Sequence, residues 1–289
     1  MPRRTTAPVP VALAALAALA GLTACSAEPA PPAAPAAPQH RPAAVPVTTA
    51  LPADVADMVL PTTGEQTRWT QGLDAFGRLA ADTAVRACLA ETRTPAPPHE
   101  PPAFVRFSEI PDLPFIGRNG FNGVIVPGSA DPAPDRPAAG AGQQQVQNRC
   151  MDTGRTVDQS LRTLYVKLQG QWFQEEAGLR RHPQVVAALR GFGPCLAAHK
   201  VEAADENAFF ALVDRRLQDG DTAGEHALAG TYATCMKPVE DVRGELRRAL
   251  GERFRAAHRQ EIAALGTALP ARIRDLERRY SVRISFPAL

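Results

Sequence analysis

The chain has 289 residues, of which 45% are hydrophobic, and its 32 basic side chains nearly balance its 30 acidic ones. A net charge this close to zero excludes the strongly basic type of nucleic-acid-binding protein, so we expect no nucleic-acid partner. Loss of Arg3 and Arg4 with an N-terminal leader would make the two signs equal, at 30 residues each.

Residues 1–24 have the organisation of a secretory signal peptide. Arg3 and Arg4 give a positively charged start, and residues 9–22 consist almost wholly of Ala, Leu and Val. This apolar stretch is shorter than the roughly 20 residues that a helix needs to cross a bilayer. We therefore predict a leader that is removed.

The leader ends in Leu-Thr-Ala-Cys at positions 22–25, which resembles the lipobox of bacterial lipoproteins. The resemblance implies that the Cys25 thiol receives a diacylglyceryl group and that Cys25 becomes the new N-terminus. Two acyl chains such as palmitate satisfy the condition for stable anchoring. We predict a mature protein held on the outer face of the cell membrane. The alternative is ordinary cleavage after Ala24, with Cys25 merely following.

Residues 25–62 are predicted to be a linker, because Ala and Pro dominate from Ser26 to about Pro61. Proline fixes its backbone φ angle and lacks an N–H donor, so we expect this segment to be a disordered, extended tether. The folded part is then expected to occupy residues 63–289.

Apolar residues recur at spacings of three and four through most of residues 63–289, which predicts helices. The last helical segment covers about 50 residues, from Leu228 to Tyr280, with breaks expected at Pro238 and Pro270. Strand patterns are almost absent. The predicted fold is all-α, an irregular helical bundle with a long C-terminal helix. The other expected helices are 63–92, 143–181 with an interruption at Gly170, 182–201 with a bend near 191–194, and 206–217.

Residues 94–142 are rich in Pro and Gly and are predicted to form a long loop, which we expect to lie partly over the helices because it contains four phenylalanines. A brief extended run is expected at 124–126. The segment 118–123 is aromatic and flanked by glycines, so Arg118 and Phe121 are candidate binding residues. The alternative interpretation is a surface turn.

Four cysteines remain after Cys25, and an even number in an exported chain favours disulfides. Zinc is the competing interpretation, but zinc ligands usually come in close pairs, whereas the nearest two cysteines are 40 residues apart. We therefore predict disulfides, with no metal and no cofactor. Of the three possible connectivities, a division into two successive units favours Cys88 with Cys150 and Cys195 with Cys235.

Three cysteine-containing segments carry a resemblance to a known family. They read Arg-Cys-Met-Asp-Thr-Gly at 149–154, Gly-Phe-Gly-Pro-Cys-Leu at 191–196 and Thr-Cys-Met at 234–236. This arrangement, over about residues 66–276, resembles a family of secreted actinobacterial lipoproteins with repeated Cys-Met helices. The resemblance implies an exported helical lipoprotein and carries over no activity. The chain departs from the pattern at Cys88-Leu89 and at Pro238.

No strong catalytic motif is present, and we assign no catalytic residue. Two weak groupings remain. His258 and Glu261 could share a metal or a proton, or form a surface ion pair. Glu175 and Glu176 follow Trp172-Phe173, which suggests either a sugar platform or a core Trp beside solvated carboxylates.

Residues 247–283 contain ten arginines but only four acidic residues. A basic helix face that includes Arg255 and Arg259 could attract a membrane or an anionic wall polymer, and the alternative is a solvated face balanced within the chain. The leading hypothesis is a non-catalytic envelope lipoprotein that binds an envelope protein or a wall component. The rival hypothesis is a cell-wall hydrolase that uses some of Glu175, Glu176, His258 and Glu261.

Overall fold

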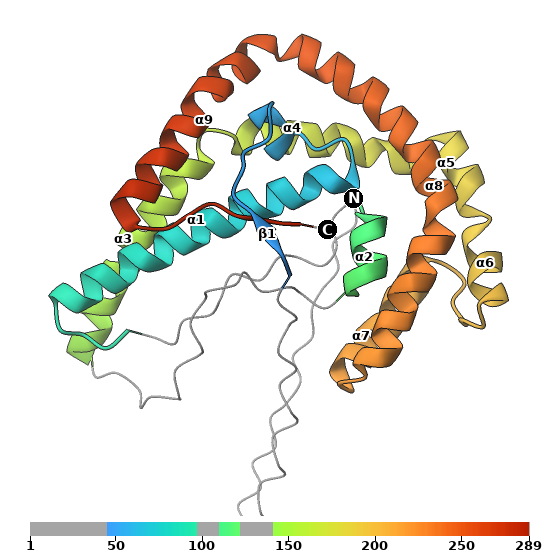
Figure 1. Ribbon diagram of the computed structural model, residues 1–289, viewed down its shortest axis with the longest axis horizontal. Coiled ribbons are helices and arrows are strands. Elements are labelled where there is room, and N and C mark those ends of the chain that lie inside the picture. The colour runs from blue at the N-terminus through green and yellow to red at the C-terminus, as the bar shows by residue number, and fades with distance from the viewer. Residues whose placement is uncertain (1–44, 97–109, 122–140, 289) are drawn as a thin grey trace, which may run out of the picture. The chain divides into compact units, whose positions relative to one another are not determined.

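The computed structural model describes residues 45–96, 110–121 and 141–288, and these residues are predominantly helical (Figure 1). The predicted all-α class is confirmed. The only sheet in this part of the chain is one antiparallel pair of two-residue strands. In chain order the elements are β1 Val47–Thr48, the 3-10 helix η1 Val55–Met58, α1 Gly64–Glu91, α2 Leu113–Asn119, α3 Ala141–Arg162, α4 Val166–Glu176, the 3-10 helix η2 Ala177–Arg181, α5 Pro183–Leu189, α6 Phe192–Ala198, α7 Glu206–Gln218, α8 Thr222–Ala257, α9 Arg259–Tyr280 and β2 Phe286–Pro287.

Helix α1 begins where the sequence predicts because Thr63 caps it. The Thr63 hydroxyl accepts a hydrogen bond from the Gln66 N–H, and the Gln66 side chain accepts one from the Thr63 N–H, which together form a capping box. Helix α1 packs along α3, as Figure 1 shows. The predicted disulfide between Cys88 and Cys150 joins the end of α1 to the first half of α3.

Residues 45–62 belong to the folded part, so the prediction that the tether continues to residue 62 is wrong for this stretch. Met58, Val59 and Leu60 are completely buried. The indole N–H of Trp172 donates to the Pro61 carbonyl at 3.0 Å, which fixes the end of the segment. Pro52 and Pro61 lie outside the helices and do not prevent burial of the apolar residues between them. Residues 25–44 of the predicted linker lie outside the described residues.

Two large hydrophobic clusters form the core. The first gathers α1, α3, α4, α9 and residues 58–60 around Trp172 and Phe254. The second gathers α2, α5, α6, α7 and the first half of α8 around Phe121, Phe209 and Tyr232. Helix α8 contributes to both clusters, and the predicted disulfide between Cys195 and Cys235 joins α6 to it.

The breaks in the long C-terminal helical segment differ from the prediction. Pro238 and Pro270 both lie inside helices, and the chain breaks at His258 instead. An interior proline loses one backbone hydrogen bond, but Val239 and Leu269 beside the two prolines are buried, and their packing offsets that loss. Helices α8 and α9 meet at an angle in Figure 1 rather than running collinearly.

The remaining helix boundaries agree with the sequence in part. The interruption predicted at Gly170 falls at residues 163–165 instead, and Gly170 lies within α4. The predicted bend near 191–194 is confirmed as the break between α5 and α6. Part of the loop predicted at 94–142 is helix α2, and the extended run predicted at 124–126 lies outside the described residues. None of the described helices is long and apolar enough to cross a membrane.

Candidate functional site

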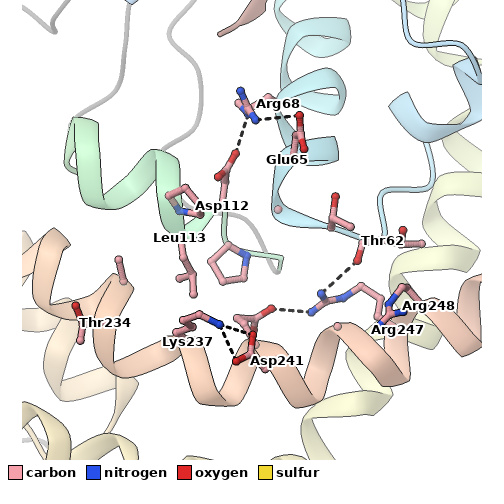
Figure 2. Close-up of a pocket in the computed structure, with 17 residues that line it drawn as sticks. Thr62, Glu65, Arg68, Asp112, Leu113, Thr234, Lys237, Asp241, Arg247 and Arg248 are labelled. Carbon is pink, nitrogen blue, oxygen red and sulfur yellow. Dashed lines mark hydrogen bonds and ion pairs between the residues drawn. The ribbon is translucent and has the colours of Figure 1, made fainter. Parts of the chain in front are cut away.

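A cleft of about 740 Å³ lies where α1, α2 and α8 approach one another (Figure 2). Residues 62–65 and Arg68 line one side, at the start of α1. Residues 111–114, which lead into α2, line a second side. The floor is a face of α8 whose residues recur at spacings of three and four, as one side of a helix requires. Those residues include Ala233, Lys237, Glu240, Asp241, Gly244, Arg247 and Arg248.

Gly64 allows the start of α1 and residues 111–114, the two walls above the floor of the cleft, to lie close together. A Cβ atom at this position would lie 2.3 Å from the Pro111 carbonyl oxygen and 2.5 Å from the Asp112 Cα, so only glycine permits this approach. Gly244 on the floor is different, because no atom lies within 4 Å of the position of its absent Cβ. Larger side chains at residue 244 would therefore enter the open space of the cleft.

A buried ion pair connects the two upper walls. The Arg68 Nε lies 2.8 Å from an Asp112 carboxylate oxygen, and both side chains are less than one-tenth exposed. Asp112 also caps α2 by accepting a hydrogen bond from the Phe115 N–H at 3.1 Å. Burial raises the pKa of Asp112 above its ordinary value, although the nearby Arg68 charge opposes this. The pair fixes α2 against α1 and sets the width of the cleft.

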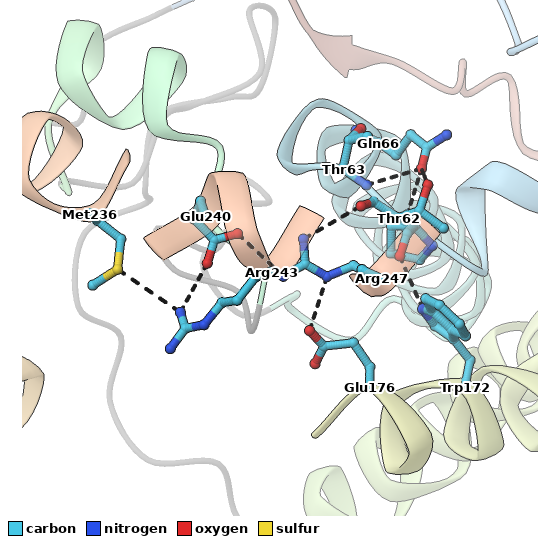
Figure 3. Close-up of polar contacts among 10 residues, drawn as sticks. Thr62, Thr63, Gln66, Trp172, Glu176, Met236, Glu240, Arg243 and Arg247 are labelled. Carbon is cyan, nitrogen blue, oxygen red and sulfur yellow. Dashed lines mark hydrogen bonds and ion pairs between the residues drawn. The ribbon is translucent and has the colours of Figure 1, made fainter. Parts of the chain in front are cut away.

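A second buried network supports the floor (Figure 3). The Arg247 side chain is almost fully buried and donates to Glu176 at 3.0 Å, to Glu240 at 3.2 Å and to the Thr62 carbonyl at 3.5 Å. Arg243 donates to the other Glu240 oxygen at 2.9 Å. The Glu240 carboxylate, whose side chain is 11% exposed, is therefore shared by two guanidinium groups, and α8 is connected to α4 and to the start of α1.

The charges around the cleft cancel. Its lining contains four basic and four acidic side chains, and Lys237 and Asp241 at the exposed rim form an ion pair at 2.8 Å. Apolar surface comes from Pro111, Leu113 and Ala233, and Figure 2 shows Leu113 extending from α2 toward Lys237. The cleft therefore combines apolar contacts with fixed charges of both signs, and it is neither an anion site nor a cation site.

The candidate binding loop around residue 121 is part of the core, so that prediction is wrong for Phe121. Phe121 is buried in the second hydrophobic cluster, and its backbone N–H donates to the buried Glu225 carboxylate. Gly120 has a φ of 78°, and a Cβ there would meet the Glu225 oxygens at 2.8 Å. The glycine therefore serves a tight turn after α2. Arg118 lies on the exposed side of α2.

Arg255 and Arg259, the candidate binding residues of the basic segment, have different environments. Arg255 forms ion pairs with Asp54 at 2.7 Å and with Asp57, so it connects η1 to α8. These ion pairs give Arg255 a structural role, and its role in binding stays a prediction. Burial raises the pKa of Asp57, and Arg255 opposes that shift. Arg259 at the start of α9 is exposed. Arg247 in the same segment is buried, so the ten arginines do not form one continuous solvent-facing surface.

The residues considered for hydrolysis lie outside the cleft. The His258 Nδ1 lies 3.4 Å from a Glu261 oxygen, in the surface pair that the sequence suggested as one alternative. Trp172 is buried in the core and Glu175 is exposed, again as one alternative predicted. Glu176, however, is buried against Arg247 rather than solvated. The described residues therefore do not bring these four groups together around one cavity.

The sequence did not reveal the cleft because its lining comes from three segments that are far apart along the chain. No family model, no characterised protein and no solved structure matches this chain in the comparisons. The functional argument therefore depends on the residues and their geometry.

Proposed function

We propose that the protein is an exported, lipid-anchored envelope protein that binds a partner without catalysing a reaction. The proposed location is supported by the positively charged start of the chain, the short apolar stretch and the lipobox-like end at Cys25. The resemblance of its cysteine-containing segments to actinobacterial lipoproteins supports the same location. Residues 1–44 lie outside the described part of the chain, so the proposed location is argued from the sequence alone.

The cleft between α1, α2 and α8 is the observation that carries the binding proposal. Its volume of about 740 Å³ falls within the range of roughly 300–1,000 Å³ typical of ligand sites. Buried ion pairs hold its walls, so little conformational entropy is lost when a ligand enters. The carboxyl group of Asp112 is already used in a helix cap and an ion pair, which favours a structural role over acid–base chemistry.

The proposed occupant is a segment of an envelope protein rather than an anionic wall polymer. The basic and acidic side chains around the cleft are equal in number, so a highly charged polymer would gain little net attraction there. The apolar side chains of a polypeptide segment can pack against Leu113 and Pro111. Its hydrogen-bond donors and acceptors can bind the acidic and basic side chains at the rim.

Lipidation is tested by growing cells that express the full chain with an alkyne-bearing palmitate. We expect the label on the wild-type protein and on a Cys88→Ser variant, and no label on Cys25→Ala. The wild-type protein should also enter the detergent-rich phase on temperature-induced phase separation. Label that persists in Cys25→Ala would contradict anchoring at this residue.

Binding in the cleft is tested with a photo-crosslinking residue placed at Thr234, which is exposed in the cleft lining. Ala227, exposed on the same helix but absent from that lining, is the matched control position. In native membranes we expect a discrete adduct from residue 234 and none from residue 227.

Two glycine substitutions in α8 separate occupation of the cleft from a general effect on the helix. Gly244→Leu fills the cleft, whereas Gly230→Leu lies outside its lining, and neither position has an atom within 4 Å of the added Cβ. The adduct should be lost with Gly244→Leu and kept with Gly230→Leu. Equal adducts in both variants would show that the cleft is not the binding site.

A further inference from the structure

The residue that follows the last turn of α6, His199, lies beside the second disulfide. Cys195 and His199 are four residues apart, so they lie on the same side of the helix, and Cys235 of α8 is bonded to Cys195. One ligand atom from each of the three residues lies within 4.8 Å of the others. His199 is exposed and Cys195 is half-buried, so the group is accessible from solvent.

The other disulfide lacks this arrangement. Within the described residues, Cys195, His199 and Cys235 are the only group of three or more potential metal ligands that lie this close together. Cys88 and Cys150 have no third ligand of this kind beside them there. The two disulfides therefore differ in whether a third potential metal ligand lies beside them. This difference can affect metal binding only when the disulfide is reduced to two thiols.

We propose that reduction of the Cys195–Cys235 bridge creates a metal site for Zn²⁺ or a similar thiophilic ion. An external dithiol transfers two electrons and two protons to the bridge, giving two thiols, and is itself oxidised to a disulfide. Zn²⁺ then binds the two thiolates and one imidazole nitrogen, with release of two protons. The disulfide form of the external dithiol can take back two electrons from the thiolates and two protons from water, which reforms the bridge and releases the ion.

The donor set fits this class of ion. Thiolate and imidazole ligands favour zinc, whereas calcium and magnesium require oxygen ligands. Three protein ligands leave the fourth tetrahedral position for water or an external ligand, as in zinc sites that keep an open position. The bound ion would preserve a connection between α6 and α8 that reduction otherwise removes, so metal and disulfide become alternative links at one place in the fold.

The test uses the full chain, reduced with a phosphine and titrated with Co²⁺ as a spectroscopic substitute for zinc. We expect one equivalent to bind, with a thiolate-to-cobalt charge-transfer band in the near ultraviolet. The band should be absent in Cys235→Ser and unchanged in Cys88→Ser. His199→Ala should weaken binding by more than about tenfold, since even partners outside the ligand shell contribute roughly 10–100-fold.

Alkylation gives a second measurement with an internal control. Zn²⁺ should slow the reaction of iodoacetamide with Cys195 and Cys235 in the reduced chain and leave Cys88 and Cys150 unaffected, as read by peptide mass spectrometry. If reduction unfolds the helices, recovery of far-ultraviolet circular dichroism on addition of Zn²⁺ supports the site, and failure to recover it overturns the proposal. Full affinity in His199→Ala, or equal protection of all four cysteines, also overturns it.

Discussion

Phe121 lies among aromatic rings, with centroid distances of 6.1 Å to Phe209, 5.6 Å to Phe210 and 5.5 Å to Tyr232. Truncation to Ala would remove these edge-to-face contacts and leave a cavity, so we expect Phe121→Ala to lower the free energy of unfolding by about 3–5 kcal/mol. Urea denaturation followed by circular dichroism measures this. Arg118→Ala, on the exposed side of α2, should change it by less than about 0.5 kcal/mol. A small effect at Phe121 would contradict its assignment to the core.

Asp112 predicts a pH dependence with a definite sign. Its pKa is higher in the folded chain than the ordinary value of 3.8, so the folded state holds the proton more tightly than the unfolded state does. The stability that this group contributes is therefore lost as the pH rises from about 3.8 through the folded pKa.

The matched variant is Asp112→Asn, which keeps a capping side chain but does not titrate. We expect the difference in unfolding free energy, wild type minus variant, to fall as the pH rises from near 3.8 to neutrality. Urea midpoints at several pH values measure it. A difference that grows with pH would mean that attraction to Arg68 outweighs the effect of burial.

The segment before α1 behaves as an element of the fold, which leads to a prediction opposite to that for a tether. Met58 is fully buried in the first cluster, so Met58→Ala should cost about 2–5 kcal/mol of stability. Thr49→Ala, at an exposed position of the same segment, should have an effect within about 0.5 kcal/mol. Chemical denaturation of both variants distinguishes the two descriptions.

Elements with strong local signals were predictable from sequence. The Thr63 cap and the Asp221 cap, which accepts from the Gly224 N–H at 2.9 Å, depend on side chains close in sequence to the helix that they begin. The break at His258 was not predictable, because neither proline nor glycine marks it and its ring stacks on Phe254 in the bend. Burial of residues 58–60 was missed for a similar reason, since Trp172 and α9 provide their environment from far along the chain.

The two disulfides stabilise different clusters. The Cys88–Cys150 bridge lies in a small cluster between α1 and α3, and the Cys195–Cys235 bridge lies in the second hydrophobic cluster. They close sequence separations of 62 and 40 residues, and the loop-entropy model assigns about 4 kcal/mol to each as an upper figure. We expect the double variants Cys88→Ala/Cys150→Ala and Cys195→Ala/Cys235→Ala each to lose up to that amount. Hydrogen exchange should rise mainly in α1 and α3 for the first and in α6 and α8 for the second. A uniform rise in both would show that the clusters unfold as one unit.

The candidate site was much less predictable than the fold. The even number of cysteines after the predicted leader favoured disulfides, and the division of the chain into two successive units favoured the pairing that the structure has. The cleft depends on Gly64, Asp112 and Gly244 meeting across three segments, and none of these residues carries a motif. The arginines of the C-terminal segment have different environments that composition does not distinguish, because Arg247 is buried, Arg255 is ion-paired and Arg259 is exposed.

The pairing of β1 with β2 brings the two ends of the described fold together, with the Ala288 N–H donating to the Pro46 carbonyl at 2.8 Å. The backbone of this part of the chain therefore comes close to a closed ring. A circular permutant that joins these ends through a short linker and opens the chain at Gly220, a left-handed turn residue with no atom near its missing Cβ, would keep every described helix intact. The same proximity means that Ala288, the last described residue, lies next to the point where the chain enters the described fold.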